Sequence, residues 1–311
     1  MQRKILITGG AGNIGGSLAR RLVRNPDNFV VIVDSMLTGS AAKLPDRSSP
    51  NWLFIRADVN SRDDIAPVMT AHRFDVVFHY AAVVGVRRTL ENPHLVLNDI
   101  KGFENVLGLA KNTGTRRVFF SSSSEVYGEA VEVPQREDTT PLNSRLPYAI
   151  VKNVGEAFFR TYSQEFGLDH TIFRFFNTYG PLQSTDFVVS RFIRQAIAGE
   201  DLTIYGDGSQ SRTFCYIDDN LDFTEKVLEE ELWLNDTVNV GNDCEVTVAD
   251  LAEKVLRITG SKSRIVHLPP LPEGDMSRRC PDVSKMLATL GRPLLPIEEG
   301  IRRTAEAGTG G

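Results

Sequence analysis

The stretch that most constrains the fold is a strand, a glycine-rich turn and a helical pattern at the start of the chain. Residues 4–8 are apolar and predict a short β-strand, and an amphipathic helical pattern follows Gly15. The turn between them, 9–15, reads Gly-Gly-Ala-Gly-Asn-Ile-Gly and has the spacing G-x-x-G-x-x-G. Glycine lets the backbone approach a ligand closely, so a pyrophosphate can lie on the N–H groups at the helix N-terminus. The stretch therefore predicts a dinucleotide site.

An acidic residue at the end of the next apolar run indicates which dinucleotide binds. The run 30–33 is followed directly by Asp34. A carboxylate at the end of the second strand accepts a hydrogen bond from a ribose 2′-OH and repels a 2′-phosphate. The sequence therefore predicts NAD rather than NADP.

Composition excludes several other classes of protein. A hydrophobic content of 41% and a charged content of 24% are typical of a globular protein, and a net charge of −5 with scattered basic residues predicts no nucleic-acid surface. The three cysteines are far apart and form no C-x-x-C, so we expect neither disulfides nor a metal site. No apolar run approaches the ~18 residues of a membrane span, and Met1 lies directly before the first strand. We expect no signal peptide and a cytoplasmic location.

Alternating strands and helices predict an α/β fold, a Rossmann doubly wound parallel sheet with ligands at the carboxyl ends of its strands. After Pro181 this alternation fades. We predict an NAD-binding domain over 1–176, which 214–241 rejoins, and a smaller C-terminal substrate-binding lobe built from 177–213 and 242–311. Helices are predicted over 61–71, 93–113, 147–166, 187–198, 218–231 and 247–259. Later strands are predicted over 52–59, 75–82, 117–121, 169–176, 202–205, 237–240 and 264–268, with a proline-rich loop over 269–281.

Two further stretches carry residues suited to proton transfer. Tyr148 and Lys152 are four residues apart and share one face of a predicted helix. A phenol with a pKa of about 10 is a poor base at neutral pH, but a nearby ammonium favours its phenolate. The polar stretch 121–128 follows a predicted strand, where its hydroxyls can bind a substrate hydroxyl, and Glu125 within it is a candidate base or electrostatic partner. Taken alone, the tyrosine–lysine pair is equally typical of a surface helix, and the glutamate of a helix-capping acid.

With these residues identified, the chain resembles the extended short-chain dehydrogenase/reductase family, in particular its nucleotide-sugar epimerases, dehydratases and decarboxylases. The resemblance covers nearly the whole chain. One departure is Asn13, where the family usually carries an aromatic residue, and another is Leu146, where it usually has serine. The resemblance rests on Thr8–Gly15, Asp34 with Thr38-Gly39, Asp58-Val59, Ser123–Gly128, Tyr148 with Lys152, Arg174–Pro181, Tyr205–Phe214 and Arg278–Asp282.

The resemblance implies NAD as the cofactor, a UDP-sugar as the substrate and no metal. It implies that Ser123 and Tyr148 contact the sugar 4-OH, with Tyr148 as the base, Lys152 as the holder of its phenolate, and Glu125 as a further catalytic residue. The residues implied to contact the cofactor are Gly9, Gly12, Asn13, Ile14, Gly15, Asp34, Ser35, Thr38, Gly39, Asp58, Val59, Ala81, Ala82, Asn98, Ser121, Tyr148 and Lys152. The residues implied to bind the nucleotide sugar are Ser124, Asn177, Arg191, Tyr205, Arg212 and one of Arg278 and Arg279, of which we choose Arg279.

The resemblance implies a first step in which Tyr148 removes the 4-OH proton and the C4 hydride passes to NAD⁺, giving a 4-keto sugar. Conflicting motifs leave open the reaction that follows this oxidation. Dehydratases of dTDP-glucose carry aspartate at the position of Ser124, which argues against that reaction, whereas GDP-mannose dehydratases share the Ser-Glu pair. Ser124-Glu125 and Arg279–Asp282 resemble the UDP-glucuronate decarboxylases, but 81–87 looks more like the 4-epimerases. We place 4-epimerisation of a UDP-sugar slightly ahead of decarboxylation of UDP-glucuronate.

Two other functions and one oligomeric assembly are also hypotheses. A non-catalytic NAD-binding protein would tend to lose Tyr148 or Lys152, and this chain keeps both. A net reductase that uses free NADH stays open. By analogy with the family, the helices 93–113 and 147–166 form a four-helix bundle in a homodimer.

Overall fold

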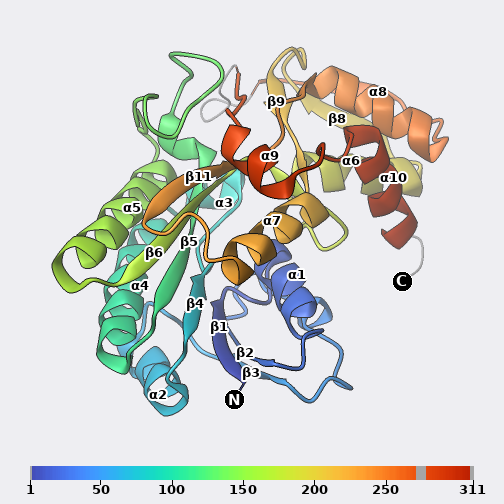
Figure 1. Cartoon of the computed structure of the whole chain (residues 1–311). Helices are drawn as coiled ribbons and strands as arrows, with labels where there is room; N and C mark the ends of the chain where they lie inside the picture. Colours follow the sequence, from blue (N-terminus) through green and yellow to red (C-terminus); the bar gives the residue numbers. More distant parts are fainter. Residues whose placement is uncertain (1, 271–277, 309–311) are drawn as a thin grey trace. The chain divides into compact units, whose positions relative to one another are not determined.

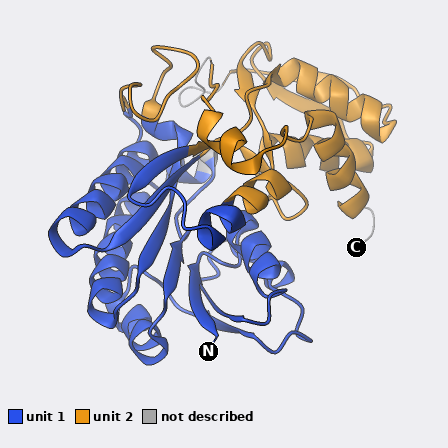
Figure 2. Cartoon of the chain, in the orientation of Figure 1, with its two compact units in different colours: residues 1–126, 144–174, 224–238 blue, residues 127–143, 175–223, 239–311 orange. Residues whose placement is uncertain are grey.

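The computed structural model describes residues 2–270 and 278–308 (Figure 1). These residues form two compact units (Figure 2). The first unit contains 1–126, 144–174 and 224–238, and the second contains 127–143, 175–223 and 239–311. Part of the predicted proline-rich loop, 271–277, lies outside the described residues.

The first unit is built on a seven-stranded sheet with the order β11-β6-β5-β4-β1-β2-β3. Each pair from β5 through β4, β1 and β2 to β3 is parallel, as the alternating pattern predicted. The strand order reverses at β1, whose neighbours are β4 and β2, and this is where open α/β sheets bind their ligands. The strands are β1 (Arg3–Thr8), β2 (Asn28–Asp34), β3 (Trp52–Arg56), β4 (Val76–His79), β5 (Arg117–Ser123), β6 (Asp169–Phe175) and β11 (Asp236–Val240).

Helices cover both faces of this sheet, with α2, α4 and α5 on one face and α1 on the other (Figure 1). Proline stands at the first position of α4 and of α5, and glycine in the left-handed conformation ends both, at Gly114 and Gly167. These signals explain why both helices match the predicted bounds. The helices are α1 (Asn13–Leu22), α2 (Arg62–His72), α3 (Val86–Glu91), α4 (Pro93–Thr113), α5 (Pro147–Phe166) and α7 (Ile217–Glu229), and η1 (Ala41–Lys43) is a 3₁₀ turn.

The core between the sheet and α4/α5 is aromatic and tightly packed. Phe103, Phe120 and Phe159 are buried and contact one another ring to ring, at centroid distances of 5.3 Å and 4.7 Å along the series. A Cβ on Gly155 would lie 2.5 Å from the Phe120 ring. Glycine is therefore required at this point of α5, which fixes how closely the helix lies on β5.

The second unit is made of short strand pairs and helices. Strands β8 (Leu202–Tyr205) and β13 (Ile265–Leu268) pair in parallel, and β9 (Ser211–Thr213) and β12 (Glu245–Thr247) pair antiparallel. The sequence predicted strands β8 and β13 but not their pairing, and it predicted none of β9, β12, α9 and α10. Strands β9 and β12 have three residues each, too few to show a periodic pattern. The remaining elements are β7 (Thr178–Tyr179), β10 (Cys215–Tyr216), η2 (Ser124–Tyr127), α6 (Val188–Ala198), α8 (Val248–Thr259), α9 (Ser284–Leu290) and α10 (Ile297–Gly308).

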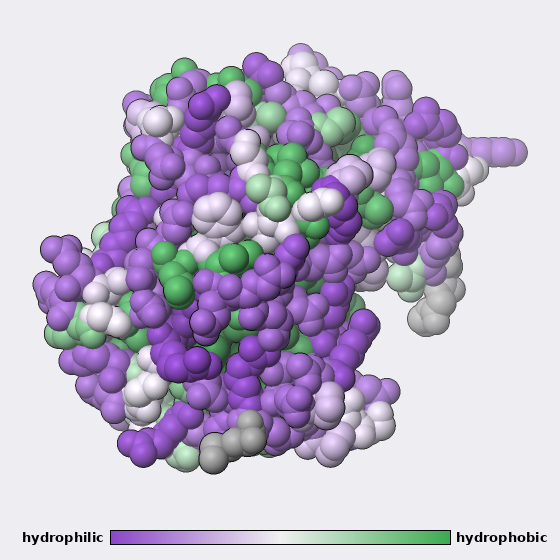
Figure 3. All heavy atoms as spheres, viewed as in Figure 1, coloured by the Kyte–Doolittle hydropathy of each residue, from purple (hydrophilic) through white to green (hydrophobic). Residues whose placement is uncertain are grey.

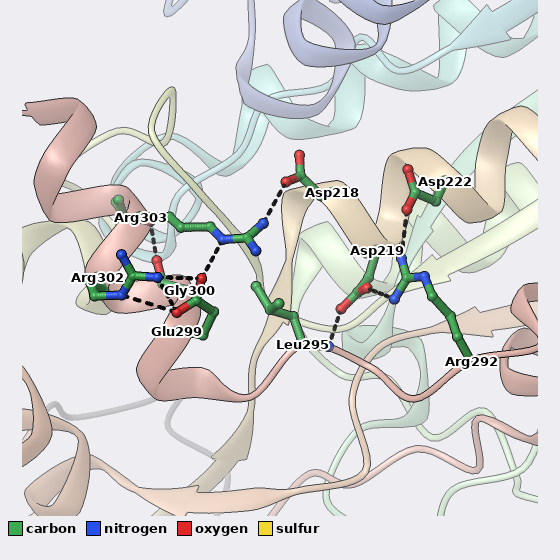
Figure 4. Close-up of polar contacts among 10 residues, drawn as sticks. Asp218, Asp219, Asp222, Arg292, Leu295, Glu299, Gly300, Arg302 and Arg303 are labelled. Carbon is green, nitrogen blue, oxygen red and sulfur yellow. Dashed lines mark hydrogen bonds and ion pairs between the residues drawn. The ribbon is translucent and has the colours of Figure 1, made fainter.

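Ion pairs hold the C-terminal segment of the second unit (Figure 4). Arg292 donates to Asp219 and to Asp222 at 2.6 Å each, and the Leu295 N–H donates to the other oxygen of Asp219. Arg303 on α10 reaches Glu299 and Asp218. Since Asp219 is buried, this network fixes the start of α10 against the first turns of α7.

Hydrophilic residues predominate on the face drawn in Figure 3, and apolar ones form small separate groups there. Among the described residues, no helix is long and apolar enough to cross a membrane.

Candidate active site

The glycine turn after β1 is packed so closely that side chains would not fit. Gly9 has a φ of +67°, and a Cβ there would lie 2.7 Å from the backbone of Ala81; a Cβ on Gly15 would lie 2.5 Å from the Gly9 carbonyl oxygen. Helix α1 begins here with Gly12 as its N-cap, and no side chain caps its first N–H groups. Open N–H groups at a helix N-terminus bind anions. The turn therefore fits the pyrophosphate of NAD.

Asp34 at the end of β2 holds two backbone segments together, a role that the sequence did not indicate. One carboxylate oxygen accepts the Ala11 N–H at 2.9 Å and the other accepts the Met36 N–H at 2.8 Å. A Cβ on Gly39 would lie 2.7 Å from this carboxylate. Asp34 thus fixes the glycine turn to the loop that carries Ser35 and Thr38, while each oxygen keeps a second lone pair for a ribose hydroxyl.

The other predicted cofactor residues lie after β3 and β4, in the first turn of α1 and on α4. Thr8 at the end of β1 accepts the Tyr80 and Ala81 N–H groups at 3.1 and 3.2 Å, which holds the loop after β4 against the glycine turn. The Asn13 side-chain oxygen is buried without a hydrogen-bond partner in the part of the chain that the structure describes. An orphaned polar atom at this position is consistent with a bound ligand. Of the remaining predicted residues, Asp58 is exposed, Val59 is buried, and Ala82, Asn98 and Ile14 are half-buried.

Lys152 is buried on the sheet-facing side of α5, close to Tyr148. Its ammonium lies 5.8 Å from the centroid of the Tyr148 ring and donates to the carbonyl oxygen of Ser121 at 2.6 Å. Burial lowers the pKa of Lys152 to about 8, although attraction to Asp99 opposes that shift. The structure therefore brings together the predicted pair and the end of β5, in an environment where the amine can lose its charge near neutral pH.

The serines predicted to meet the substrate lie where β5 ends and η2 begins. Ser121, Ser123 and Ser124 are all buried, and Ser123 accepts the N–H of Glu125 at 3.2 Å. Glu125 is half-buried in the first turn of η2, the place that a capping acid would also take. Tyr148 is half-buried at the start of α5. The first unit thus presents a phenol, an ammonium, a carboxylate and several hydroxyls at one edge of the sheet.

A buried ion pair beneath these residues was not foreseen from the sequence. Glu156, one helical turn after Lys152, accepts two hydrogen bonds from Arg174 of β6 at 2.8 and 2.7 Å, and one from Ser122 of β5 at 2.6 Å. Burial alone would raise the pKa of Glu156, but the hydrogen bonds and charge of Arg174 hold it below its ordinary value. The signal that could have found the pair is a glutamate on the same face of the helix as Tyr148 and Lys152.

The predicted substrate residues, apart from Ser124, belong to the second unit. Asn177 has a φ of +40° and donates to the Thr213 carbonyl oxygen at 2.9 Å, and Arg212 is buried on β9. The guanidinium of Arg191 lies 5.7 Å from the Tyr205 ring, its Nε is buried with no partner among the described residues, and burial lowers its pKa. Such an arginine is suited to an anionic ligand.

The neighbouring arginines 278 and 279 differ in their surroundings. Arg278 is exposed and pairs with Glu245 at 2.8 Å, whereas Arg279 is buried. Because the Glu245 carboxylate already occupies Arg278, that arginine is a weaker candidate for binding a diphosphate.

Comparison with known proteins identifies relatives of the chain. A family model described as the NAD dependent epimerase/dehydratase family matches residues 5–241. UDP-N-acetyl-alpha-D-glucosaminuronate decarboxylase of Bacillus cytotoxicus is 35% identical over 98% of both chains. UDP-glucuronic acid decarboxylase 3 of Arabidopsis thaliana is 36% identical over 96% of this chain and 86% of its own. The crystal structure of UDP-glucose 4-epimerase with UDP-glucose from Thermotoga maritima has a TM-score of 0.92 at 31% identity and covers 98% of both chains.

Proposed function

The chain belongs to the NAD dependent epimerase/dehydratase family, and from that premise we propose that it oxidises C4 of a UDP-hexuronate and then releases the carboxylate as CO₂. It is an NAD-dependent enzyme of the nucleotide-sugar class. The observation that carries the proposed first step is the buried ammonium of Lys152 beside the Tyr148 ring at the end of β5. The relatives named as decarboxylases favour the second step.

The first step follows from the chemistry of the first unit. Tyr148 as a phenolate removes the proton of the 4-OH, while the Ser123 hydroxyl holds the same oxygen by a hydrogen bond. The Lys152 ammonium lowers the free energy of the phenolate. Bound NAD would supply the hydride acceptor for C4 and, at the end of the cycle, the hydride donor. The product of the oxidation is a 4-keto sugar whose carboxylate is β to the ketone.

Loss of CO₂ from a β-keto acid needs little further catalysis. The bond between C5 and the carboxylate carbon breaks, its electron pair moves onto the ketone oxygen as an enolate, and a proton then adds at C5. The proposal assigns the nucleoside diphosphate to Asn177, Arg191, Tyr205 and Arg212 in the second unit, and the carboxylate to an arginine such as Arg279. A guanidinium fork binds either anion with two hydrogen bonds.

A 4-epimerase is the second candidate. The stretch 81–87 after β4 resembles the epimerases, and the Thermotoga maritima enzyme shows how closely this fold matches one. An epimerase would use the same phenol, ammonium and hydroxyls, and the ketone would be reduced from its opposite face. The two candidates differ only after the 4-keto sugar has formed.

Chromatography combined with mass analysis of two incubations separates them, because C4 epimers have the same mass. The purified protein is incubated with UDP-glucuronate and, separately, with UDP-glucose. A product of UDP-glucuronate lighter by one CO₂ supports decarboxylation, and an isobaric product with inverted C4 supports epimerisation. Turnover of neither sugar nucleotide would overturn both proposals.

We also propose that two copies pair through α4 and α5. Each helix carries an exposed apolar side chain, Leu97 on α4 and Ile150 on α5. A second copy would cover them in a four-helix bundle. Sedimentation should then give a dimer that becomes a monomer in Leu97→Asp/Ile150→Asp, and a monomeric wild-type chain would contradict the proposal.

A further inference from the structure

An arginine lies beside Asp34 on the face of the sheet that carries the glycine turn. In the parallel pairing of β2 with the edge strand β3, the register partner of Asp34 is Arg56, the last residue of β3. Register partners share a face of the sheet, and successive residues alternate between faces. Val33 and Ile55 pack into the core that contains side chains of α2 and α4. Asp34 and Arg56 therefore face the other side, that of α1 (Figure 1).

The guanidinium of Arg56 is exposed and has one hydrogen-bond partner. Its Nε donates to the carbonyl oxygen of Ser35 at 3.4 Å, which places the side chain over the end of β2. Its two NH₂ groups have no acceptor, and it forms no ion pair, among the residues that the structure describes. The Asp34 carboxylate instead accepts the N–H groups of Ala11 and Met36. Arg56 is thus a cation with open donors beside the predicted ribose site.

These two side chains act in opposite directions on a phosphate at the ribose 2′ position. The carboxylate of Asp34 repels such a phosphate, which is the basis for predicting NAD rather than NADP. A guanidinium binds phosphate with two parallel hydrogen bonds, and an arginine near the ribose is the usual partner of the 2′-phosphate of NADP. One group that excludes NADP therefore lies next to one that would bind it.

We infer that Arg56 is a further dinucleotide-binding residue: it gives the chain a latent site for a 2′-phosphate, and Asp34 alone keeps that site closed to NADP. Removing the charge of Asp34 should then admit NADP, and should do so only while Arg56 is present. The inference concerns the dinucleotide, so it does not depend on which sugar nucleotide is turned over.

The test compares the dissociation constants of NADP and NAD, measured by titration calorimetry on nucleotide-free protein. Asp34→Asn keeps the size of the side chain and removes its charge, so we expect the ratio of the NADP constant to the NAD constant to fall by about 10-fold or more. Asp34→Asn/Arg56→Met should lose most of that gain, because the open donors are gone. The same ratio in Asp34→Asn and in Asp34→Asn/Arg56→Met would overturn the inference.

The matched control removes an arginine from the opposite edge of the same sheet. Arg24 is exposed, follows the end of α1 and precedes the amino end of β2. Asp34→Asn/Arg24→Met should therefore keep the full gain in NADP binding. Loss of the gain in this control as well would show a general effect of net charge and would overturn the role of Arg56.

A single substitution keeps the inference testable if Asp34→Asn does not fold. Arg56→Met leaves both backbone hydrogen bonds of Asp34 in place. It should weaken the binding of NADP by about threefold or more and that of NAD by less than about twofold, since only NADP carries the 2′-phosphate. Ligand-observed NMR at millimolar dinucleotide measures both. An equal effect on the two dinucleotides, or none on either, would overturn the inference.

Discussion

At the scale of single residues, the candidate site places one charge where water cannot compensate it. Lys152 is 3% exposed and donates to one carbonyl oxygen, that of Ser121. An ammonium in such a position gains more from a neighbouring phenolate than it would in water, because the local dielectric constant is low. The same burial makes the charge costly, which is why its pKa falls to about 8.

Replacing the phenol tests its role as the base. Tyr148→Phe removes the oxygen that we propose accepts the 4-OH proton, and it leaves the half-buried ring in place. We expect turnover of the sugar nucleotide to fall by about 10³-fold or more, with NAD still bound at the wild-type level. Steady-state rates and the nicotinamide content of the purified variant measure both. A variant that kept wild-type rates would remove Tyr148 from the mechanism.

At the scale of elements, helix α5 is central to the candidate site, because it carries Tyr148 and Lys152 over the end of β5. Two features fix its position: Gly155 allows close approach to Phe120, and Glu156 binds Arg174 of β6 and Ser122 of β5. Ser122 is the residue directly before Ser123. The ion pair therefore links the helix that carries Tyr148 to the strand that carries Ser123.

Neutralising Glu156 should destabilise this region strongly. Glu156→Gln leaves the buried guanidinium of Arg174, 1% exposed, without its counter-charge. We expect the free energy of unfolding to fall by about 3–5 kcal/mol in urea titrations. Glu165→Gln, an exposed acid on the same helix, should change it by less than about 0.5 kcal/mol. Equal stability of the two variants would show that the ion pair does not hold α5 in place.

Elements with strong local signals could be predicted from the sequence, and those defined by tertiary contacts could not. Helices α4 and α5 match their expected bounds because proline begins them and glycine ends them. Strands β9 and β12 have three residues each and exist through mutual pairing, which leaves no periodic pattern. Likewise, the sequence located Asp34 and Lys152, but the hydrogen bonds that Asp34 accepts from Ala11 and Met36 form only once folding brings these residues close.

At the scale of the whole molecule, the predicted residues divide between two units. The first unit contains all the residues predicted to contact NAD and to carry the chemistry, and the second contains the polar side chains predicted to hold the nucleoside diphosphate. Each unit has its own core, one around the parallel sheet and one among short strand pairs and helices. This division is consistent with a protein that holds its cofactor on one unit and selects its substrate with the other.

Buried histidines should make the folded chain sensitive to acid. Burial lowers the pKa of His79 to about 3 and that of His170 to about 4. Because each folded-state pKa lies below the ordinary value of about 6.5, the unfolded state binds more protons below that pH. The stability is fully present above about pH 6.5 and is lost as the pH falls toward these values. We expect each histidine to contribute about 2 kcal/mol of lost stability between pH 7 and pH 5.

Urea titrations at the two pH values measure this loss. His79→Leu should lower stability at pH 7, since the Thr8 hydroxyl loses its partner at 3.0 Å, but it should make stability depend less on pH. A variant with the same pH dependence as the wild-type chain would show that His79 is not the group that titrates.

The most direct test of the account follows deuterium placed at C4 of UDP-glucuronate through a single turnover. Oxidation at C4 predicts a transient absorbance of reduced nicotinamide that rises more slowly with the deuterated substrate, and a product that still carries deuterium at C4. Product formed with no such transient and no isotope effect, or with its C4 deuterium lost to water, would contradict the account.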